Sequence, residues 1–286
     1  MKNIIKITLF LFLPIKLLGT AQIPDLIIYK GDTLSLDARP LDFYPNLELI
    51  NTKSLFNNKI GTCCTCCWRG YIAVWEIIDN KLYLTKIKNY CYLSYTKNME
   101  SYNNVGIGID SIGSEFADLK TLFPDRYENG KVRADWVNGK LISPQGKLLF
   151  YIHDGSGGIH EKELEFTVEN GVLIQTELLD NSKTKKSEYS KNENLLREFI
   201  YSNINYENLP KSDTIKRRVT VSIISTDDNG RIDSVNIIRG VNELYDKEAI
   251  RVIKSIPEWD VIYRHGKRMN QIWSIPIIFD LTEEKE

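Results

Sequence analysis

The chain has 286 residues, with 37 Lys and Arg residues against 38 Asp and Glu residues and a formal net charge of −1. This near-neutral balance lacks the basic footprint that nucleic-acid-binding proteins present to phosphates, so we expect no nucleic-acid partner. The length suits two domains, and the 42% of hydrophobic residues is enough to build two cores.

Residues 1–21 predict a secretory signal peptide. The short apolar run from Ile7 to Ile15 follows a basic start, and small residues lead up to Ala21, after which we expect cleavage. An uncleaved membrane anchor is the alternative, but a helix that spans a bilayer needs about 20 mostly apolar residues. Lys6 and Lys16 bracket a much shorter run. We therefore expect an exported protein of the periplasm or cell envelope.

Residues 22–180 predict a β-rich domain. Turn signals recur between short apolar or alternating runs, at Asp79-Asn80, Asn129-Gly130, Asn138-Gly139, Pro144-Gln145-Gly146 and Asn170-Gly171. Hairpins at this spacing indicate an antiparallel meander that rolls into a partial barrel, with one helix over Ser114–Leu122 that ends before Pro124. The patterns Cys67–Tyr71 and Ser143–Leu148 resemble those of uncharacterised secreted proteins only, which implies a fold and no activity.

Four cysteines lie within the five residues Cys63-Cys64-Thr65-Cys66-Cys67, and the fifth is Cys91. Structural zinc sites draw two ligands from each of two separated knuckles, so a single distant cysteine makes a metal site the weaker interpretation. Disulfides form readily in exported proteins, and free thiols are the third alternative. If Asp79-Asn80 is a tight turn, Trp68 falls opposite Cys91 and Cys67 lies one step away. We therefore predict a Cys67–Cys91 disulfide and no metal site.

One histidine-containing loop resembles a reactive site. His153 and Asp154 precede a glycine-rich run, a combination that can serve general acid–base chemistry or recruit a metal. However, His153 continues the alternation of the preceding strand, and Asp154 and the glycines suit a turn. Ser156 lacks the strand-to-helix turn of a nucleophile elbow. We expect no catalytic residue and no cofactor.

Residues 181–191 are rich in Ser, Thr, Lys, Glu and Asn, which predicts an interdomain linker. Apolar residues then recur at helical spacing over Asn192–Ile204, which predicts the first helix of a C-terminal domain that spans residues 192–286. Alternating apolar residues on both sides of Asn229-Gly230 predict a hairpin over Arg217–Arg239, in which both turn residues take positive φ.

Beyond the hairpin the apolar period becomes helical again. Residues Leu244 to Lys254 predict an amphipathic helix that stops before Pro257. The run from Met269 to Phe279 then predicts a strand. Pro276 cannot donate to a ladder, so this strand belongs at a sheet edge with one unpaired side. The predicted order is helix, hairpin, helix and strand, which makes this an α+β domain of α-β-β-α-β type.

These segments resemble the C-terminal domain of TonB-type energy transducers. The matching anchors, in chain order, are Val219/Val221/Ile223, Asp228–Ile232, Val235–Gly240, Glu248–Val252, Pro257–Trp259, Gly266–Asn270 and Ile275–Phe279. Several spaced anchors in one order are far more specific than a single short motif. The resemblance implies helices paired with a small antiparallel sheet, which binds an extended segment of an outer-membrane receptor as an added strand.

The resemblance places this binding at the edge strand, Met269 to Phe279. Exposed backbone donors and acceptors there would supply affinity, and alternate side chains would supply selectivity. We expect the contact residues ahead of the proline, namely Asn270, Gln271, Ile272, Trp273 and Ser274. The alternative is that the apolar side chains of this strand simply fill the domain core, so the binding prediction rests on the backbone edge.

The chain also departs from the TonB pattern. Those transducers have an N-terminal membrane helix and a long proline-rich spacer, whereas the nine prolines here are scattered singly. We therefore do not expect direct contact with an inner-membrane motor. The predicted partner is an outer-membrane receptor or another envelope protein, with a homodimer as an open alternative. Two functions follow: a non-catalytic adaptor in receptor-linked transport, or a secreted enzyme or small-ligand binder whose site lies in the N-terminal domain.

Overall fold

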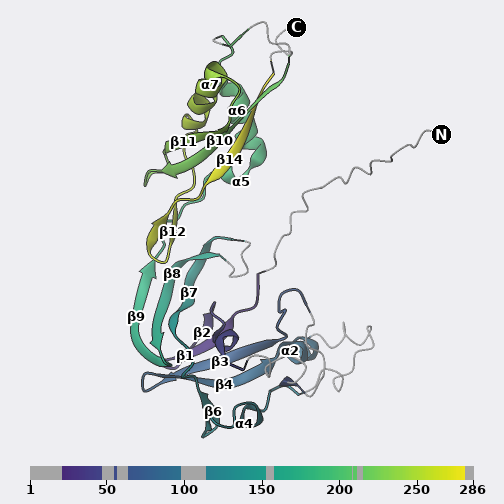
Figure 1. Ribbon diagram of the computed structural model, residues 1–286, viewed down its shortest axis with the longest axis vertical. Coiled ribbons are helices and arrows are strands. Elements are labelled where there is room, and N and C mark those ends of the chain that lie inside the picture. Colours follow the sequence, from purple (N-terminus) through teal and green to yellow (C-terminus); the bar gives the residue numbers. More distant parts are fainter. Residues whose placement is uncertain are drawn as a thin grey trace, which may run out of the picture.

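The computed structural model describes residues 21–46, 55–56, 64–97, 114–152, 158–207, 209–210 and 215–280. The predicted signal peptide, apart from Ala21, and the run His153–Gly157 lie outside the described residues. The described chain has a strand-rich N-terminal domain at one end and a smaller mixed domain at the other (Figure 1). Strands dominate and helices are few, which confirms the predicted α+β class.

Nine strands form the N-terminal sheet. They are β1 (Asp25–Tyr29), β2 (Asp32–Leu36), β3 (Tyr71–Ile78), β4 (Lys81–Asn89), β5 (Tyr127–Glu128), β6 (Lys131–Arg133), β7 (Gly139–Phe150), β8 (Ile159–Glu169) and β9 (Val172–Asp180). Neighbours follow the order β2-β1-β3-β4-β9-β8-β7, and β6 pairs with β4 and β5. The backbone N–H of Asp37, directly after β2, donates to the carbonyl of Ile142 on β7 at 2.9 Å. The two ends of the series therefore meet, and the sheet curls into a partial barrel.

The interior of this barrel is apolar, and Trp75 and Phe166 are fully buried in it. One pairing departs from the predicted antiparallel meander, because β1 runs parallel to β3. Buried Asp25, at the start of β1, links the two strands. Its carboxylate accepts hydrogen bonds from the backbone N–H of Ala73 and the indole N–H of Trp75, both at 3.0 Å. These two residues belong to β3, so the hydrogen bonds join the start of β1 to β3.

The predicted turns of this domain differ in their outcome. Asp79-Asn80, Asn129-Gly130 and Asn170-Gly171 each have positive φ at both residues and join the strands of hairpins, as predicted. Pro144-Gln145-Gly146 is instead a bulge inside β7, where Gly146 has a φ of 75° and the register with β8 shifts after Gln145. That predicted turn is therefore wrong, because β7 continues through it.

The described helices of the N-terminal domain are η1 (Pro40–Phe43), α2 (Tyr90–Lys97) and α4 (Leu119–Leu122). The predicted helix over Ser114–Leu122 is too long. Asp118 caps α4, since its carboxylate accepts from the N–H groups of Lys120 and Thr121, and the helix can begin only after it. The preceding Phe116 is extended and forms a β-bridge with Lys88.

The predicted linker, residues 181–191, is tied to the C-terminal domain. The N–H of Ser187 and the hydroxyl of Ser190 both donate to one carboxylate oxygen of Asp260, at 2.8 and 2.5 Å. The segment also forms the short helix α5 (Glu188–Lys191). It therefore connects the two domains as an ordered piece and not as a free spacer.

The C-terminal domain contains α6 (Glu193–Asn203), β10 (Arg217–Thr226), β11 (Ile232–Arg239), α7 (Glu243–Lys254), β12 (Ile262–Arg264), β13 (Lys267–Met269) and β14 (Trp273–Phe279). This is the predicted order with one added two-stranded hairpin, β12–β13. The helices begin at the side-chain caps Asn192 and Asn242. Figure 1 shows α6 and α7 beside the sheet β11-β10-β14. Buried Ile200, Tyr245 and Ile277 show that both helices share one core with this sheet.

The β10–β11 hairpin forms over the predicted range but has a longer connection. Of the two predicted turn residues only Gly230 has positive φ, at 87°. Its N–H donates to the carbonyl of Asp227 at 3.0 Å, and the N–H of Asp227 donates to the carbonyl of Arg231 at 2.8 Å. The carboxylate of Asp227 also accepts from the N–H groups of Asn229 and Arg231. The predicted two-residue turn is therefore wrong, because this aspartate fixes a longer loop.

Candidate functional site

Strand β14 lies at one edge of the three-stranded sheet β11-β10-β14. Its seven residues pair with β10 in an unbroken antiparallel register, from Trp273 opposite Ile223 to Phe279 opposite Arg217. Among the described residues no strand pairs with the other side of β14. This side is therefore open, as the position of Pro276 in the sequence predicts.

Pro276 indicates which backbone groups face the open side. It lies opposite Thr220 and has no N–H to donate. In an antiparallel pair, positions whose N–H and C=O point to the partner alternate with positions whose groups point away. A proline leaves the ladder intact only where the backbone points away, so we infer that Ser274, Pro276 and Ile278 face the open side. Ser274 and Ile278 then offer N–H donors, and all three offer carbonyl acceptors.

A hollow of about 350 Å³ lies along this open side. Its walls come from α6 (Glu193, Leu196, Arg197, Ile200 and Tyr201) and from β14 (Ile275, Pro276 and Ile278). The lining is mainly apolar, and its two charged side chains, Arg197 and Glu193, pair with each other at 3.1 Å. Because the lining includes both the buried side chain of Ile275 and the exposed Ile278, the hollow follows the strand edge itself. A segment laid beside β14 would therefore contact the lining of this hollow.

Strand β11 forms the other edge, but its geometry is less regular. The register between β10 and β11 shifts between Thr220 and Val221, between Ile223 and Ser225, and between Ser225 and Thr226. Bulges twist a strand and disfavour pairing with a further strand. The β10–β14 ladder has no such shift. Of the two edges, β14 is therefore better suited to accept a foreign strand.

Three of the five predicted contact residues lie ahead of the strand. Asn270, Gln271 and Ile272 form the connection from β13 to β14 and are exposed, Ile272 by 66%. They can touch a partner, but within the described ladder they have no strand neighbour on β10. The structure therefore does not place them on the regular edge that the sequence predicts for them.

The other two predicted contact residues, Trp273 and Ser274, begin β14 and differ in environment. The ring of Trp273 packs edge-on against Trp259, with ring centres 5.9 Å apart, and contributes to the domain core. Ser274 is exposed on the open edge. The regular open edge thus runs from Ser274 to Ile278, which lies towards the C-terminus of the predicted set.

Sequence reasoning missed the wall that α6 contributes. The apolar spacing of this helix predicts a single core-facing stripe, and Ile200 is indeed buried. Tyr201, however, lines the hollow and is 42% exposed. The signal was present in the sequence, because apolar residues cover more of this helix than one core stripe requires.

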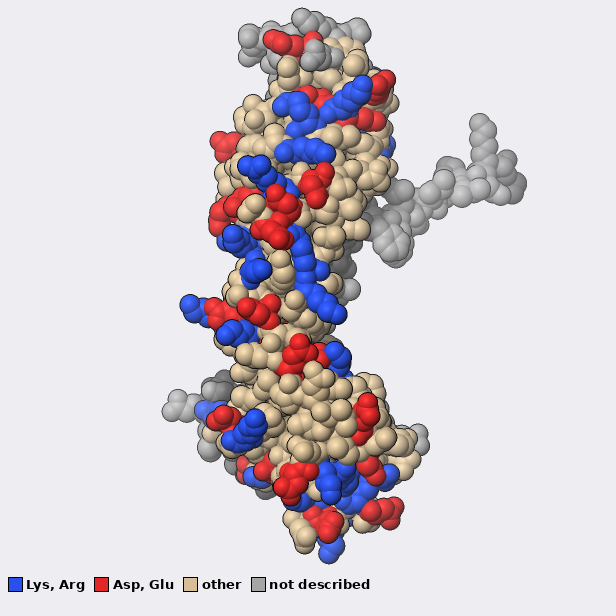
Figure 2. All heavy atoms as spheres, turned by 90° about the vertical axis from the view of Figure 1, so that its left-hand side faces the viewer, with Lys and Arg blue, Asp and Glu red and all other residues tan. Residues whose placement is uncertain are grey.

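Charged side chains on the face shown in Figure 2 are of both signs. Lys and Arg residues alternate with Asp and Glu residues along both domains. On this face, the described part of the chain presents no large patch of one sign. Any partner that binds here must therefore be recognised by shape and hydrogen bonding more than by long-range charge.

Comparisons of the chain with family models, with curated proteins and with solved structures found no match in any of the three. The TonB resemblance therefore stays a prediction from the residues themselves.

No helix within the described ranges combines the length and the apolar character that crossing a membrane requires. The same ranges contain no group of three or more His, Cys, Asp or Glu side chains that could hold a metal ion.

The predicted Cys67–Cys91 disulfide is wrong. Cys67 is a free, buried thiol, whereas Cys91 is disulfide-bonded. The prediction extended the β3–β4 ladder too far, because its last pair is Tyr71 opposite Asn89. Beyond that pair the chain enters α2 on one side and a turn on the other, so Trp68 does not face Cys91 across a ladder.

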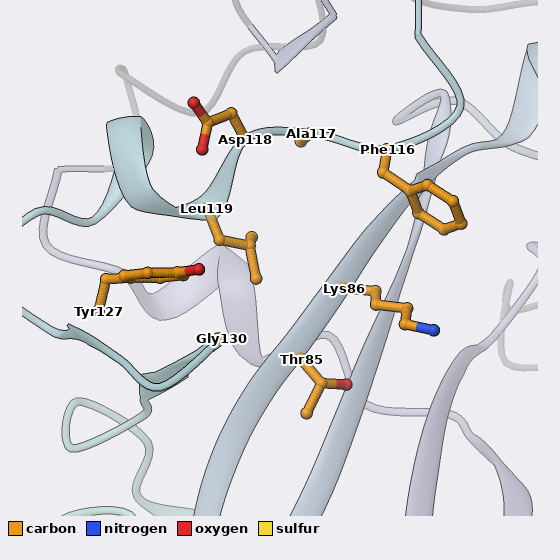
Figure 3. Close-up of a pocket in the computed structure, with 8 residues that line it drawn as sticks. All are labelled: Thr85, Lys86, Phe116, Ala117, Asp118, Leu119, Tyr127 and Gly130. Carbon is orange, nitrogen blue, oxygen red and sulfur yellow. The ribbon is translucent and has the colours of Figure 1, made fainter.

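A second hollow, of about 280 Å³, lies beside α4 (Figure 3). Its charged side chains are Lys86 and Asp118, which point away from each other in Figure 3. The ammonium group of Lys86 lies 5.7 Å from the ring centre of Phe116. Hydrogen bonds from Thr121 lower the pKa of Asp118, which serves as the cap of α4. Both charges have structural roles, so we assign no chemistry to this hollow.

A larger cavity, of about 710 Å³, lies where the β12–β13 hairpin meets β7, β8 and β9. Its lining residues are Lys140, Ile142, Glu165, Glu177 and Leu179 from the N-terminal domain and Arg264, His265, Gly266, Lys267 and Met269 from the hairpin. Buried Glu165 pairs with the ammonium group of Lys140 at 2.6 Å. Buried Glu163 pairs with Nδ1 of His265 at 2.7 Å. The size is that of a small-ligand site.

Asp25 has a raised pKa, as catalytic acids often have. Burial raises its pKa to about 6, although the guanidinium group of Arg69 lies 2.8 Å away and opposes the shift. Both carboxylate oxygens already accept hydrogen bonds, from Ala73 and Trp75. We therefore assign Asp25 a structural role in the β1–β3 pair.

Proposed function

We propose that the C-terminal domain binds an extended segment of an envelope protein, of the outer-membrane receptor class, as an added strand on β14. The observation that carries this proposal is the regular, open edge of β14 beside the hollow under α6. The added strand pairs with the outward backbone groups of Ser274, Pro276 and Ile278. Binding of this kind needs no change in the sheet, because the edge is already extended.

Recognition in this binding mode has two parts. Backbone hydrogen bonds supply affinity for almost any extended segment, whereas alternate side chains decide which segment binds. The hollow offers apolar contacts from Leu196 and Tyr201, so a segment with apolar residues at every second position fits best. The exposed pair of Arg197 and Glu193 contributes little, because surface ion pairs are weak.

In this function the protein is a non-catalytic adaptor of the periplasm or cell envelope. The TonB resemblance favours receptor-linked transport across the outer membrane as its setting. The ordered segment between the domains would hold the N-terminal barrel at a fixed distance from the captured strand. The barrel then offers a second surface on which another protein or ligand can bind.

The test uses the full exported chain and two variants of one residue. Ser274→Pro removes an outward N–H without removing a donor to β10, whereas Ser274→Ala keeps that N–H and serves as the matched control. The immobilised protein captures a receptor from an outer-membrane extract of the source bacterium, and a peptide of the receptor's periplasmic segment is synthesised. By calorimetry we expect similar binding to the natural chain and Ser274→Ala, and about tenfold weaker binding to Ser274→Pro.

Hydrogen exchange locates the bound segment. The amide protons of Ser274 and Ile278 should exchange more slowly when the peptide is bound, whereas those of β11 should not change. Equal binding of the peptide to both variants, or protection on β11 alone, would contradict the proposal.

Small-ligand binding is a second candidate function, favoured by the cavity between the domains. Its walls carry both acidic and basic side chains around the apolar residues Ile142, Leu179 and Met269. Thermal unfolding of the full chain with a panel of amino acids and dicarboxylic acids tests this function. Stabilisation by one compound that is lost in Lys267→Ala supports it, and a panel without effect removes it.

A further inference from the structure

The cysteine cluster holds a disulfide that closes a very short loop. Cys64 and Cys66 are bonded to each other, two positions apart in the chain. Both are partly exposed, and Trp68 close by is 67% exposed. A disulfide stabilises a fold mainly by closing a loop in the unfolded chain, and the gain is smallest for the shortest loops. Loop closure therefore gives this bond only a small part in the stability of the fold.

The segment that carries the disulfide is held in place by other contacts. The N–H of Ile23 donates to the carbonyl of Cys66 at 2.8 Å. The side-chain amide of Gln22 donates to the carbonyl of Thr65 at 2.9 Å and accepts from the N–H of Trp68 at 3.1 Å. None of these hydrogen bonds involves a sulfur atom. The sulfur–sulfur bond can therefore open while the segment keeps its place.

The two sulfur atoms differ in their surroundings. The hydroxyl of Tyr90, the first residue of α2, lies 3.6 Å from Sγ of Cys66. A disulfide sulfur is a weak hydrogen-bond acceptor, whereas a thiolate is charged and accepts more strongly. The hydroxyl is therefore placed to stabilise Cys66 as a leaving thiolate. Attack by an external thiol is favoured at Cys64, which leaves Cys66 as the departing sulfur.

The neighbouring thiol of Cys67 does not compete for this bond. It is buried and donates to the carbonyl of Tyr71 at 3.4 Å. Burial raises the pKa of this thiol, although Arg69 nearby opposes the shift. A protonated thiol is a poor nucleophile, so Cys67 leaves the adjacent disulfide intact.

We propose that Cys64–Cys66 is a reversible redox site that exchanges with an exported dithiol protein. A thiolate of the dithiol attacks Sγ of Cys64, the Cys64–Cys66 bond breaks, and its electron pair moves to Cys66. Cys66 accepts a hydrogen bond from Tyr90 and then a proton from water. The second thiolate of the dithiol attacks its own partner sulfur in the mixed disulfide and releases Cys64, which is protonated in turn. The chain gains two electrons and two protons, and the dithiol becomes a disulfide.

The test is a redox titration of the full chain, purified from an oxidising compartment. Defined ratios of reduced to oxidised dithiothreitol are the probe, free thiols are alkylated, and peptide mapping by mass spectrometry reports each cysteine. We expect Cys64 and Cys66 to become alkylated together at a ratio that leaves the disulfide of Cys91 intact, with unchanged circular dichroism. The Cys91 disulfide is the internal control. The proposal is overturned if no Cys64–Cys66 linkage is found, or if both disulfides open at the same ratio.

Two variants test the assigned direction of attack. Tyr90→Phe keeps the ring and removes the hydroxyl. We expect the rate at which the Cys64–Cys66 disulfide is reduced at pH 7 to fall by roughly three- to tenfold, which corresponds to the free energy of one hydrogen bond. Cys67→Ser should reduce at the natural rate, since this thiol takes no part. Circular dichroism checks that both variants are folded. An unchanged rate in Tyr90→Phe, or a failure of Cys67→Ser to react, overturns the assigned path.

Discussion

Pro276 of β14 lies directly opposite Thr220 of β10, at the centre of an unbroken seven-residue ladder. By removing one donor, the proline makes the open edge a poorer template for a second copy of the same chain. We predict that Pro276→Val restores this donor and promotes self-association through β14. Analytical ultracentrifugation over a micromolar concentration range should then show a concentration-dependent dimer.

A matched control for this change is Ile278→Val, which lies on the same edge and leaves every backbone donor in place. We expect this variant to sediment like the natural chain. A Pro276→Val protein that sediments like Ile278→Val at all concentrations would show that the missing donor does not limit edge pairing.

Gly230 is confined by a close approach of the backbone at Trp259. It has a φ of 87°, and a Cβ atom at this position would lie 2.7 Å from the carbonyl oxygen of Trp259. Gly31 has a similar φ of 91°, but a Cβ atom there meets nothing within 4 Å. We predict that Gly31→Ala costs about 1 kcal/mol, from backbone strain alone. Gly230→Ala should cost about 2–4 kcal/mol, because strain and the contact add.

Urea denaturation of both glycine variants measures this difference. The unfolding of the N-terminal domain is followed for Gly31→Ala, and that of the C-terminal domain for Gly230→Ala. The comparison separates the cost of the φ angle from the cost of the contact. Equal losses in the two variants would mean that the backbone at Trp259 moves aside without cost.

Elements with a strong local period could be predicted from the sequence. Helix α7 follows from the apolar spacing of its residues and the stop at Pro257, and its cap at Asn242 fixes the start. The β10–β11 hairpin follows from alternation on both sides of a turn. The edge position of β14 also follows locally, because Pro276 lacks a donor wherever it lies.

Features set by distant contacts could not be predicted in this way. The parallel pairing of β1 with β3 includes hydrogen bonds from Ala73 and Trp75 to Asp25, about 50 residues earlier in the chain, which no local pattern predicts. Helix α2 has no clear apolar stripe, so the sequence does not show that β4 ends at Asn89, before Cys91. The α6 wall of the hollow likewise depends on the tertiary contact between two elements. The edge position of β14 was thus predictable, whereas the hollow beside it was not.

Ser187 connects the interdomain segment to the C-terminal domain. Its buried hydroxyl donates to the carbonyl of Glu258 at 3.0 Å and accepts from the N–H of Tyr189 at 3.1 Å, as the cap of α5. We predict that Ser187→Ala lowers the free energy of unfolding by about 1–3 kcal/mol, because α5 loses its side-chain cap and the carbonyl of Glu258 loses its donor. Chemical denaturation measures the loss.

The control for this substitution is Ser202→Ala on α6. Its hydroxyl is exposed and donates to the carbonyl of Glu198 on the same helix, so we expect a change within about 0.5 kcal/mol. If Ser187→Ala proved as mild as this control, the segment would be a loose connection between the domains.

Asp25 should make the stability of the N-terminal domain depend on pH. Burial raises its pKa from 3.8 to about 6 in the folded chain. Between these values the folded state keeps a proton that the unfolded state has released. The free energy of unfolding should therefore fall as the pH rises through this window, by at most about 1.4 kcal/mol per pH unit. Below it both states are protonated and above it both are ionised, so the contribution of this group is constant there.

The variant Asp25→Asn isolates this contribution, because its side chain cannot titrate and the other carboxyl groups are unchanged. Urea denaturation of both proteins from pH 3.5 to pH 7 gives two stability curves, and their difference should slope between about pH 4 and pH 6 and be level above it. The variant loses the charge pair with Arg69 as well, which shifts its whole curve but adds no slope, because arginine stays charged throughout. Two parallel curves across the window would mean that Arg69 cancels the effect of burial and that Asp25 ionises in the folded chain near its ordinary pKa.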